Sequence, residues 1–234
     1  MKAKHLMALK NIVAVSYEST AEHFDATRSK VAAHDFLWAA NQMGSDDKVF
    51  DAGCGNGRLL NYINIDPDNY LGFDQSSALI ALAKKHHPLF NFLSGDLADL
   101  SACPRDSFSI IFCSAVISHV PGRRERRAVL KDLLALCAPN GRLIISFWKI
   151  TGRNRRRLYM TWLNKNVGSH IYGWRDLIFT WKSAAGKEVV LRYYYAFSRR
   201  GFRREIRRAG WQIEAVRDDK FNYWVIAQKT KETN

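Results

Sequence analysis

The chain has 234 residues, of which 47% are hydrophobic and 25% are charged, a composition typical of an ordinary globular domain. No uncharged apolar run approaches the roughly 20 residues that span a bilayer, and no cleavable leader stands out. The four cysteines are scattered without a CxxC pair, so neither a disulfide framework nor a zinc site is expected. We therefore expect a single cytoplasmic domain with reduced thiols and no metal.

The net charge of +14 is concentrated in one part of the chain. Residues 122–210 contain 22 Lys and Arg against 5 Asp and Glu, whereas the remainder contains 14 against 17. A positive field of this size favours a polyanionic partner. From the charge alone we expect nucleic acid first, with an acidic carrier protein or a membrane surface behind it, and of these we do not expect a membrane.

In chain order, residues 17–43 have apolar side chains at helical spacings and are expected to form a helical cap. Short apolar strands then alternate with helical segments. The expected strands are 48–52, 70–74, 90–96, 107–120, 142–148, 211–219 and 222–229; the expected helices are 58–65, 76–86 and 123–138, the last ended by Pro139, Asn140 and Gly141. This alternation predicts a doubly wound, mainly parallel α/β sheet of seven strands, and the terminal strand pair predicts an antiparallel C-terminal addition at one edge.

Residues 149–191 interrupt this rhythm with a basic and aromatic segment. The segment follows the fifth strand, so it passes above the carboxyl edge of the sheet, where ligands bind in open α/β folds. We expect a substrate-side insertion within the single domain 1–234, with some helix in residues 155–165. The core is then residues 48–148, and residues 192–229 supply further substrate-side and edge segments.

The motif with the most chemical content is the glycine loop from Asp51 to Gly57, which follows a strand and precedes a helical segment. A side chain at Gly53 or Gly55 would hold the backbone away from a ligand lying over the strand end. Asp74 ends the next strand, where a carboxylate can accept hydrogen bonds from both ribose hydroxyls of an adenosine. Asp96 ends the third strand, where it can meet the adenine amino group.

A GxGxG loop by itself could serve a dinucleotide, but three acidic strand ends in succession are more specific. The set resembles the class I S-adenosylmethionine (SAM) dependent methyltransferases, whose first motif is similar to Asp-Ala-Gly-Cys-Gly-Asn-Gly. The resemblance covers residues 48–148 and implies a Rossmann-like fold, with the glycine loop against the methionyl part of SAM. The cofactor residues that it implies are Asp51, Gly53, Cys54, Gly55, Gly57, Asp74, Gln75, Asp96, Leu97 and Ser114.

Further segments are similar to the tRNA methyltransferases that esterify carboxymethyluridine at the wobble position. They are residues 17–30, 114–127, 192–197 and 222–228, and with the core they cover about two thirds of the chain. This resemblance implies tRNA as the partner. It also raises the question of the small zinc-binding activator subunit that the eukaryotic enzymes use.

A carboxylate acceptor is already ionised at neutral pH and needs no general base. It must be bound and oriented, however, and a planar guanidinium is suited to this. Arg28 is the first candidate for that role, with His119 as a second hydrogen-bond donor and Tyr17 lining the pocket. The plainer alternatives are a surface ion pair for Arg28 and a turn histidine for His119. Candidate RNA contacts are Arg124, Arg127, Arg192, Tyr193, Tyr194, Asn222 and Trp224, of which the three arginines would hold phosphates.

Two departures concern substrate recognition. The family usually has His-His where this chain has Ser118 and His119, and an acidic helix where this chain has residues 201–208, GFRREIRR. A carboxyl methyltransferase acting on an acyl group of acyl carrier protein is an alternative that also explains a positive field. A second alternative is a non-catalytic RNA-binding protein that keeps the fold as a scaffold.

Overall fold

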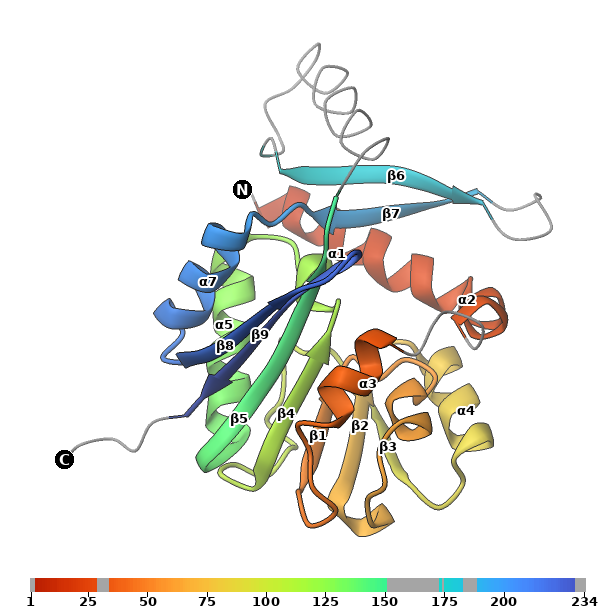
Figure 1. Cartoon of the computed structure of the whole chain (residues 1–234). Coiled ribbons are helices and arrows are strands. Elements are labelled where there is room, and N and C mark those ends of the chain that lie inside the picture. The colour runs from red at the N-terminus through yellow and green to blue at the C-terminus, as the bar shows by residue number, and fades with distance from the viewer. Residues whose placement is uncertain (1–2, 29–33, 151–172, 174, 183–188, 230–234) are drawn as a thin grey trace.

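The computed structural model describes residues 3–28, 34–150, 173, 175–182 and 189–229. Its main sheet has seven strands in the order β3-β2-β1-β4-β5-β9-β8 (Figure 1). These strands are β1 (Val49–Ala52), β2 (Tyr70–Asp74), β3 (Asn91–Ser94), β4 (Phe108–Ser114), β5 (Cys137–Trp148), β8 (Gln212–Asp218) and β9 (Asn222–Gln228). The first five are parallel, and β9 is antiparallel to both of its neighbours, β5 and β8.

The doubly wound, mainly parallel seven-stranded fold is therefore confirmed, and so is the antiparallel addition of the C-terminal strand pair at one edge. Strand β9 lies between β5 and β8, so the edge strand is β8, which precedes β9 in the chain.

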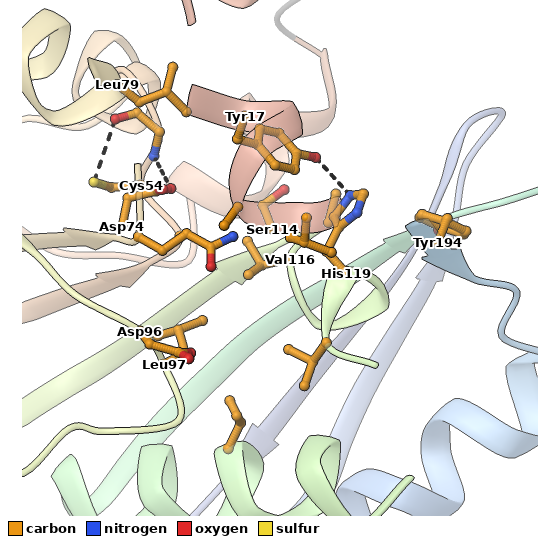
Figure 2. A pocket seen from close by; sticks show the side chains of 18 of the residues that line it. Tyr17, Cys54, Asp74, Leu79, Asp96, Leu97, Ser114, Val116, His119 and Tyr194 are labelled. Atoms are coloured by element: carbon orange, nitrogen blue, oxygen red, sulfur yellow. Dashed lines mark hydrogen bonds between the residues drawn. The ribbon is translucent and has the colours of Figure 1, made fainter. Parts of the chain in front are cut away.

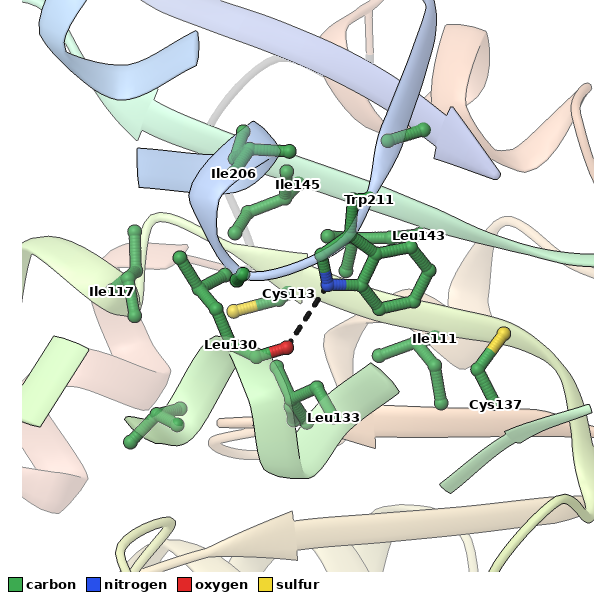
Figure 3. Packing of buried hydrophobic residues seen from close by; sticks show 14 of the residues in the cluster. Ile111, Cys113, Ile117, Leu130, Leu133, Cys137, Leu143, Ile145, Ile206 and Trp211 are labelled. Carbon is green, nitrogen blue, oxygen red and sulfur yellow. Dashed lines mark hydrogen bonds between the residues drawn. The ribbon is translucent and has the colours of Figure 1, made fainter. Parts of the chain in front are cut away.

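The described helices are α1 (Ala3–Glu18), α2 (Ala21–Arg28), α3 (His34–Ala40), α4 (Ser77–His86), α5 (Arg123–Leu136) and α7 (Arg199–Arg208). Buried strand residues alternate between two cores, as in a sheet that is covered on both faces. In β4, Ile111 and Cys113 pack with α5 and α7, whereas Ile110 and Phe112 face α3 and α4. Figure 3 shows the first of these cores, in which the Trp211 indole donates to the carbonyl of Leu130 at 2.9 Å.

Local sequence explains where several elements begin and end. The Ser76 hydroxyl accepts from the backbone N–H of Leu79 and so caps α4, as the serine pair predicts. After β4 the chain turns at Ala115, whose φ of +59° lies in the left-handed region, so the expected strand 107–120 ends at Ser114. A short 3-10 helix, η3 (Ile117–His119), follows.

Two expected helices differ in extent from those in the structure. Residues 58–65 form only the 3-10 helix η1 (Arg58–Asn61), because the Asn and β-branched residues that follow are weak helix formers and Pro67 comes soon after. The helix α5 ends at Leu136, before the Pro139 to Gly141 turn. That turn is a bulge within β5, since Phe108 pairs with Cys137 whereas Ile110 pairs with Arg142.

A second, two-stranded sheet covers the carboxyl edge of the main sheet. It consists of β6 (Asp176–Lys182) and antiparallel β7 (Val189–Tyr195), and α1 packs against β7 through Leu9, Val13 and Tyr193 (Figure 1). Because β7 runs to Tyr195, the sequence at 192–195 belongs to this hairpin and not to a segment after it. The helix expected in residues 155–165 lies outside the described residues. Within the described ranges no helix is both long and apolar enough to cross a membrane.

Candidate active site

A cavity of about 900 Å³ opens at the carboxyl ends of β1, β2 and β4, beneath α1 and the β6–β7 hairpin. It brings together most of the side chains and loop residues that the sequence singled out. Those lining it are Tyr17, Asp51, Gly53, Cys54, Gly55, Asp74, Gln75, Asp96, Leu97, Ser114, His119, Arg192, Tyr194 and Asn222. Figure 2 shows Asp74 and Asp96 toward one end of this cavity and the pair of Tyr17 and His119 toward the other.

The glycine loop forms the floor at the acidic end. Gly53 has a φ of +77°, and its N–H donates to the carbonyl of Phe73 at 2.7 Å. A Cβ at this position would lie 2.3 Å from Cγ2 of Val116, so the protein's own packing already excludes a side chain there. Gly57 also has a positive φ of +78° but does not line the cavity, so its role is in the turn itself.

The Asp74 carboxylate is held rigidly. It accepts hydrogen bonds from the backbone N–H groups of Gly55 at 3.0 Å and Ser76 at 2.9 Å. Burial raises the pKa of Asp74, and these two bonds oppose that rise by stabilising the charged form. A carboxylate offers about four lone-pair sites, so two bonds leave acceptor capacity for a ligand in the cavity.

Asp51 is buried, and it accepts a hydrogen bond from the Tyr70 hydroxyl at 2.8 Å. Burial raises the pKa of Asp51 from 3.8 to about 7; the charge of Asp74 adds to the rise, while Tyr70 and Arg58 oppose it. A carboxyl group with a pKa near neutrality becomes fully ionised when a cation is placed beside it, because the positive charge lowers that pKa. It is therefore suited to a ligand that carries positive charge.

Helix α1 closes the cavity over this end. Its Glu18 accepts from the hydroxyls of Ser76 and Ser77, each at 2.7 Å, and these bonds are the main cause of a lowered pKa. Glu18 thus binds the N-terminus of α4, where a negative charge is favoured. Lys10 of α1 lies 3.5 Å from Asp96. Sequence reasoning missed α1 before residue 17, although Leu9 and Val13 lie at the i, i+4 spacing of a packed helix face.

The other end of the cavity is built from α1, η3 and β7. His119 Nδ1 lies 2.8 Å from the carbonyl oxygen of Tyr193, and His119 Nε2 lies 2.9 Å from the Tyr17 hydroxyl. A carbonyl oxygen only accepts, so Nδ1 carries the proton; in the neutral ring Nε2 then accepts from Tyr17. The neutral ring thus donates through Nδ1 to Tyr193 and accepts through Nε2 from Tyr17.

Arg192 lies beside this pair and is buried in the cavity wall. Its Nη2 donates to the Thr20 hydroxyl at 3.2 Å, and its guanidinium carbon lies 5.0 Å from the centre of the Tyr17 ring. A guanidinium in this environment is favourably placed for a planar anion entering the cavity, because it presents a fixed fork of donors.

Comparison with known proteins agrees with this geometry. A family model described as a methyltransferase domain matches residues 50–143. The tRNA (carboxymethyluridine(34)-5-O)-methyltransferase of Saccharomyces cerevisiae is 31% identical over 154 residues, which are 64% of this chain and 53% of that protein. The protein of the same name from Schizosaccharomyces pombe is 26% identical over 227 residues, 91% of this chain and 94% of that protein.

Among solved structures, a SAM-dependent methyltransferase from Methanosarcina mazei superposes with a TM-score of 0.68 at 18% identity, covering 83% of this chain and 98% of that one. The chain belongs to the class I SAM-dependent methyltransferases. It spans about half the length of the S. cerevisiae relative and nearly all of the S. pombe relative.

SAM is the cofactor of this family. The residues that line the acidic end of the cavity in this methyltransferase are suited to binding it. The floor at Gly53 carries no side chain, Asp74 keeps acceptor capacity suited to a ribose, and Asp51 favours a positively charged ligand. Asp74 would therefore hold the adenosine part of SAM and Asp51 its cationic amino acid part, with the glycine loop beneath them.

Several residues expected to contact the substrate of the methyltransferase are placed differently. Trp224 is wholly buried among core aromatic residues and donates to Asp219 at 3.1 Å, so it offers no surface to RNA. Tyr193 is also fully buried, and its hydroxyl donates to Asp176 at 2.6 Å. Arg192 lines the cavity instead of an outer surface, which corrects its expected role at a backbone phosphate.

The remaining candidates keep positions that suit contact with a substrate. Arg124 is exposed in the first turn of α5, and Arg127 is half-buried one turn later. Tyr194 and Asn222 line the cavity. Arg28 is the last residue of α2, and its side chain lies outside what the structure describes.

Proposed function

We propose that the protein transfers the methyl group of SAM to the carboxylate of a carboxymethyl-type uridine at the wobble position of a tRNA. The observation that carries the proposal is the far end of the cavity, where Arg192, Tyr17 and His119 meet from three separate segments. The names of the two fungal relatives support the same acceptor. All three residues lie in segments that the sequence already related to this tRNA family.

When bound, SAM would supply a methyl group on a positively charged sulfur, which would leave as a neutral thioether when the methyl carbon bonds to an acceptor oxygen. A carboxylate oxygen has no proton to lose before forming that bond. The protein therefore needs no general base. Arg192 would orient the carboxylate, with the hydrogen-bonded pair of Tyr17 and His119 forming the wall beside it, and Asp74 and Asp51 would hold the cofactor against it. Helix α1 and the hairpin above the cavity would exclude water, so that catalysis consists mainly of holding the two reactants in near-attack geometry.

The test uses purified protein, SAM and tRNA from a strain that lacks the corresponding ester, followed by mass spectrometry of the nucleosides. We expect one added methyl group on the wobble uridine, which mild alkali removes because it is an ester. A tRNA whose wobble uridine lacks the carboxymethyl group is the control. A methyl group that resists alkali would refute carboxylate methylation, and transfer to a carboxylated acyl carrier protein instead of tRNA would establish the alternative.

Variants at the acceptor end test the assignment of residues. Arg192→Lys keeps the charge but removes the planar fork, so we expect turnover to fall by about 10-fold or more while SAM affinity is retained. Arg142→Lys is a matched control, because Arg142 donates to the carbonyl of Gln42 and does not line the cavity. Equal turnover of the two variants would remove Arg192 from the acceptor site.

A further inference from the structure

Helix α7 carries an unusual charge. Six of its ten residues are arginines, and its single acid is Glu205. The arginines come in pairs that recur every four residues, on the face opposite the buried Phe202 and Ile206. Five of the six are exposed, namely Arg199, Arg200, Arg204, Arg207 and Arg208, and Arg203 is half-buried.

The one acid of α7 does not offset this outer charge. Glu205 points inward and accepts from Arg126 of α5 at 3.1 Å, and both side chains are buried. Arg199 pairs with Asp218 of β8. In the part of the chain that the structure describes, no acidic side chain pairs with any of the other five arginines of α7.

The basic surface continues onto the first two turns of α5, which lies beside α7 over the same face of the sheet (Figure 1). Nε and Nη2 of Arg127 are shielded from solvent, as is Nε of Arg203, and none of these atoms has a hydrogen-bond partner among the described residues. We call the combined surface the arginine face; it consists of Arg123, Arg124, Arg127, Arg200, Arg203, Arg204, Arg207 and Arg208.

The arginine face begins at the rim of the active-site cavity. Glu125, Ala128 and Val129, from the same two turns of α5, line the cavity. A molecule that spans both regions would therefore reach from the cavity directly onto the guanidinium groups.

In isolation this arrangement is unfavourable to the helix. Like charges at i, i+4 destabilise a helix, and arginines in the first turn oppose the helix dipole. A bound anion would relieve both effects. We propose that the arginine face binds the phosphate backbone of the RNA whose modified base enters the cavity; the choice of RNA rests on the proposed function.

The composition of the face favours RNA over other polyanionic partners. Protein interfaces have an apolar centre, whereas every exposed large side chain of α7 is an arginine. A membrane-binding helix turns its apolar face to the lipid, but the apolar face of α7 is buried in the core. Guanidinium groups match phosphates in a bidentate way, and such contacts position a nucleic acid without reading its sequence.

The experiment compares two triple variants that remove the same charge. The first is Arg200→Gln, Arg204→Gln and Arg208→Gln, which keeps good helix formers and relieves repulsion, so the thermal midpoint should not fall. The control is Lys84→Gln, Lys85→Gln and Arg105→Gln, three exposed residues of which two end α4 and the third lies before β4, beside the C-terminal end of α5 and away from its first two turns. For each protein, the affinity for tRNA is measured over a range of salt concentrations, and SAM affinity is measured alongside.

We expect the α7 triple to weaken tRNA binding by about 10-fold or more and to lower the log-log salt slope by roughly 2 to 3, close to one for each phosphate that is no longer bound. The control triple should change the affinity by less than about 3-fold, and both should bind SAM as the parent does. If the two triple variants weakened tRNA binding equally, the loss would be explained by net charge alone, and the proposal would be overturned.

The outcomes separate this proposal from the proposed function. A parent that methylates tRNA, with an α7 triple that binds tRNA equally well, would refute the arginine face and leave the function standing. A parent that binds tRNA through α7 but forms no ester would keep the face and refute the function. Binding of polyglutamate or of phosphatidylserine vesicles through α7, without binding of tRNA, would overturn RNA as the partner.

Discussion

The buried carboxyl group of Asp51 makes the stability of the protein depend on pH in a predictable way. Its pKa is about 7 in the folded protein against 3.8 ordinarily, a difference of about 3. Between these values the unfolded chain is ionised while the folded protein keeps the proton, so the free energy of unfolding falls as pH rises. At 1.36 kcal/mol for each pKa unit, the loss reaches about 4 kcal/mol above pH 7.

The substitution Asp51→Asn removes this titration and keeps an acceptor for the Tyr70 hydroxyl. The variant should match the parent in stability near pH 4. It should become more stable by about 4 kcal/mol near pH 8, because only the parent then carries the buried charge. Urea unfolding at several pH values measures this difference, and Asp46→Asn, at an exposed position, is the matched control.

The same carboxyl group should couple cofactor binding to pH. SAM affinity of the parent should rise as pH increases through about 7, because ionised Asp51 attracts the cationic cofactor, and the Asn variant should lack this rise. Stability curves of parent and variant that run parallel from pH 4 to pH 8 would refute the raised pKa. A rise in SAM affinity that survives in the variant would place the cationic part of the cofactor elsewhere.

Three further substitutions have defined outcomes. Asp74→Ala removes two charge-assisted hydrogen bonds of roughly 1.5 to 3 kcal/mol each, so calorimetry should show SAM affinity lower by a factor on the order of 100 or more. Because the sequence also assigns Arg28 to the acceptor carboxylate, Arg28→Ala should keep SAM and tRNA affinity but reduce turnover about 100-fold, with little recovery in Arg28→Lys, whereas normal turnover would make Arg28 structural and leave the carboxylate to Arg192. Glu205→Gln leaves Arg126 charged and buried, so urea unfolding should show a loss of about 3 to 5 kcal/mol; an unchanged midpoint would contradict the buried ion pair.

The strands of the sheet were predictable because their signals are local. Strands such as β2 combine apolar runs with an acidic end, and α4 opens with its capping serine. Residues 58–65 show the limit of the same reasoning. Leu59, Leu60 and Ile65 are all buried, but burial of apolar residues does not fix the backbone conformation where helix propensity is weak.

The two ends of the cavity also differ in how far their residues could be predicted from local sequence. The cofactor end follows from one loop and the strand ends beside it, which the sequence presents as contiguous motifs. The acceptor end joins Tyr17 to His119 across 102 residues, and such a contact exists only once α1 and β7 have packed together. The sequence also does not show where an aromatic side chain lies: Trp224 is buried in the core, whereas Tyr194 lines the cavity.

The position of β9 has a consequence for the synthesis of the protein. This strand lies between β5 and β8, both of which leave the ribosome before it. Until β9 is made, one edge of β5 is open and β8 has no neighbour in the sheet, although α7 between them can already pack on α5. Open strand edges invite pairing with other chains, and pairing over long separations is slow. The growing chain is therefore most exposed to misassembly, and most dependent on chaperones, in the interval between the synthesis of β5 and that of β9.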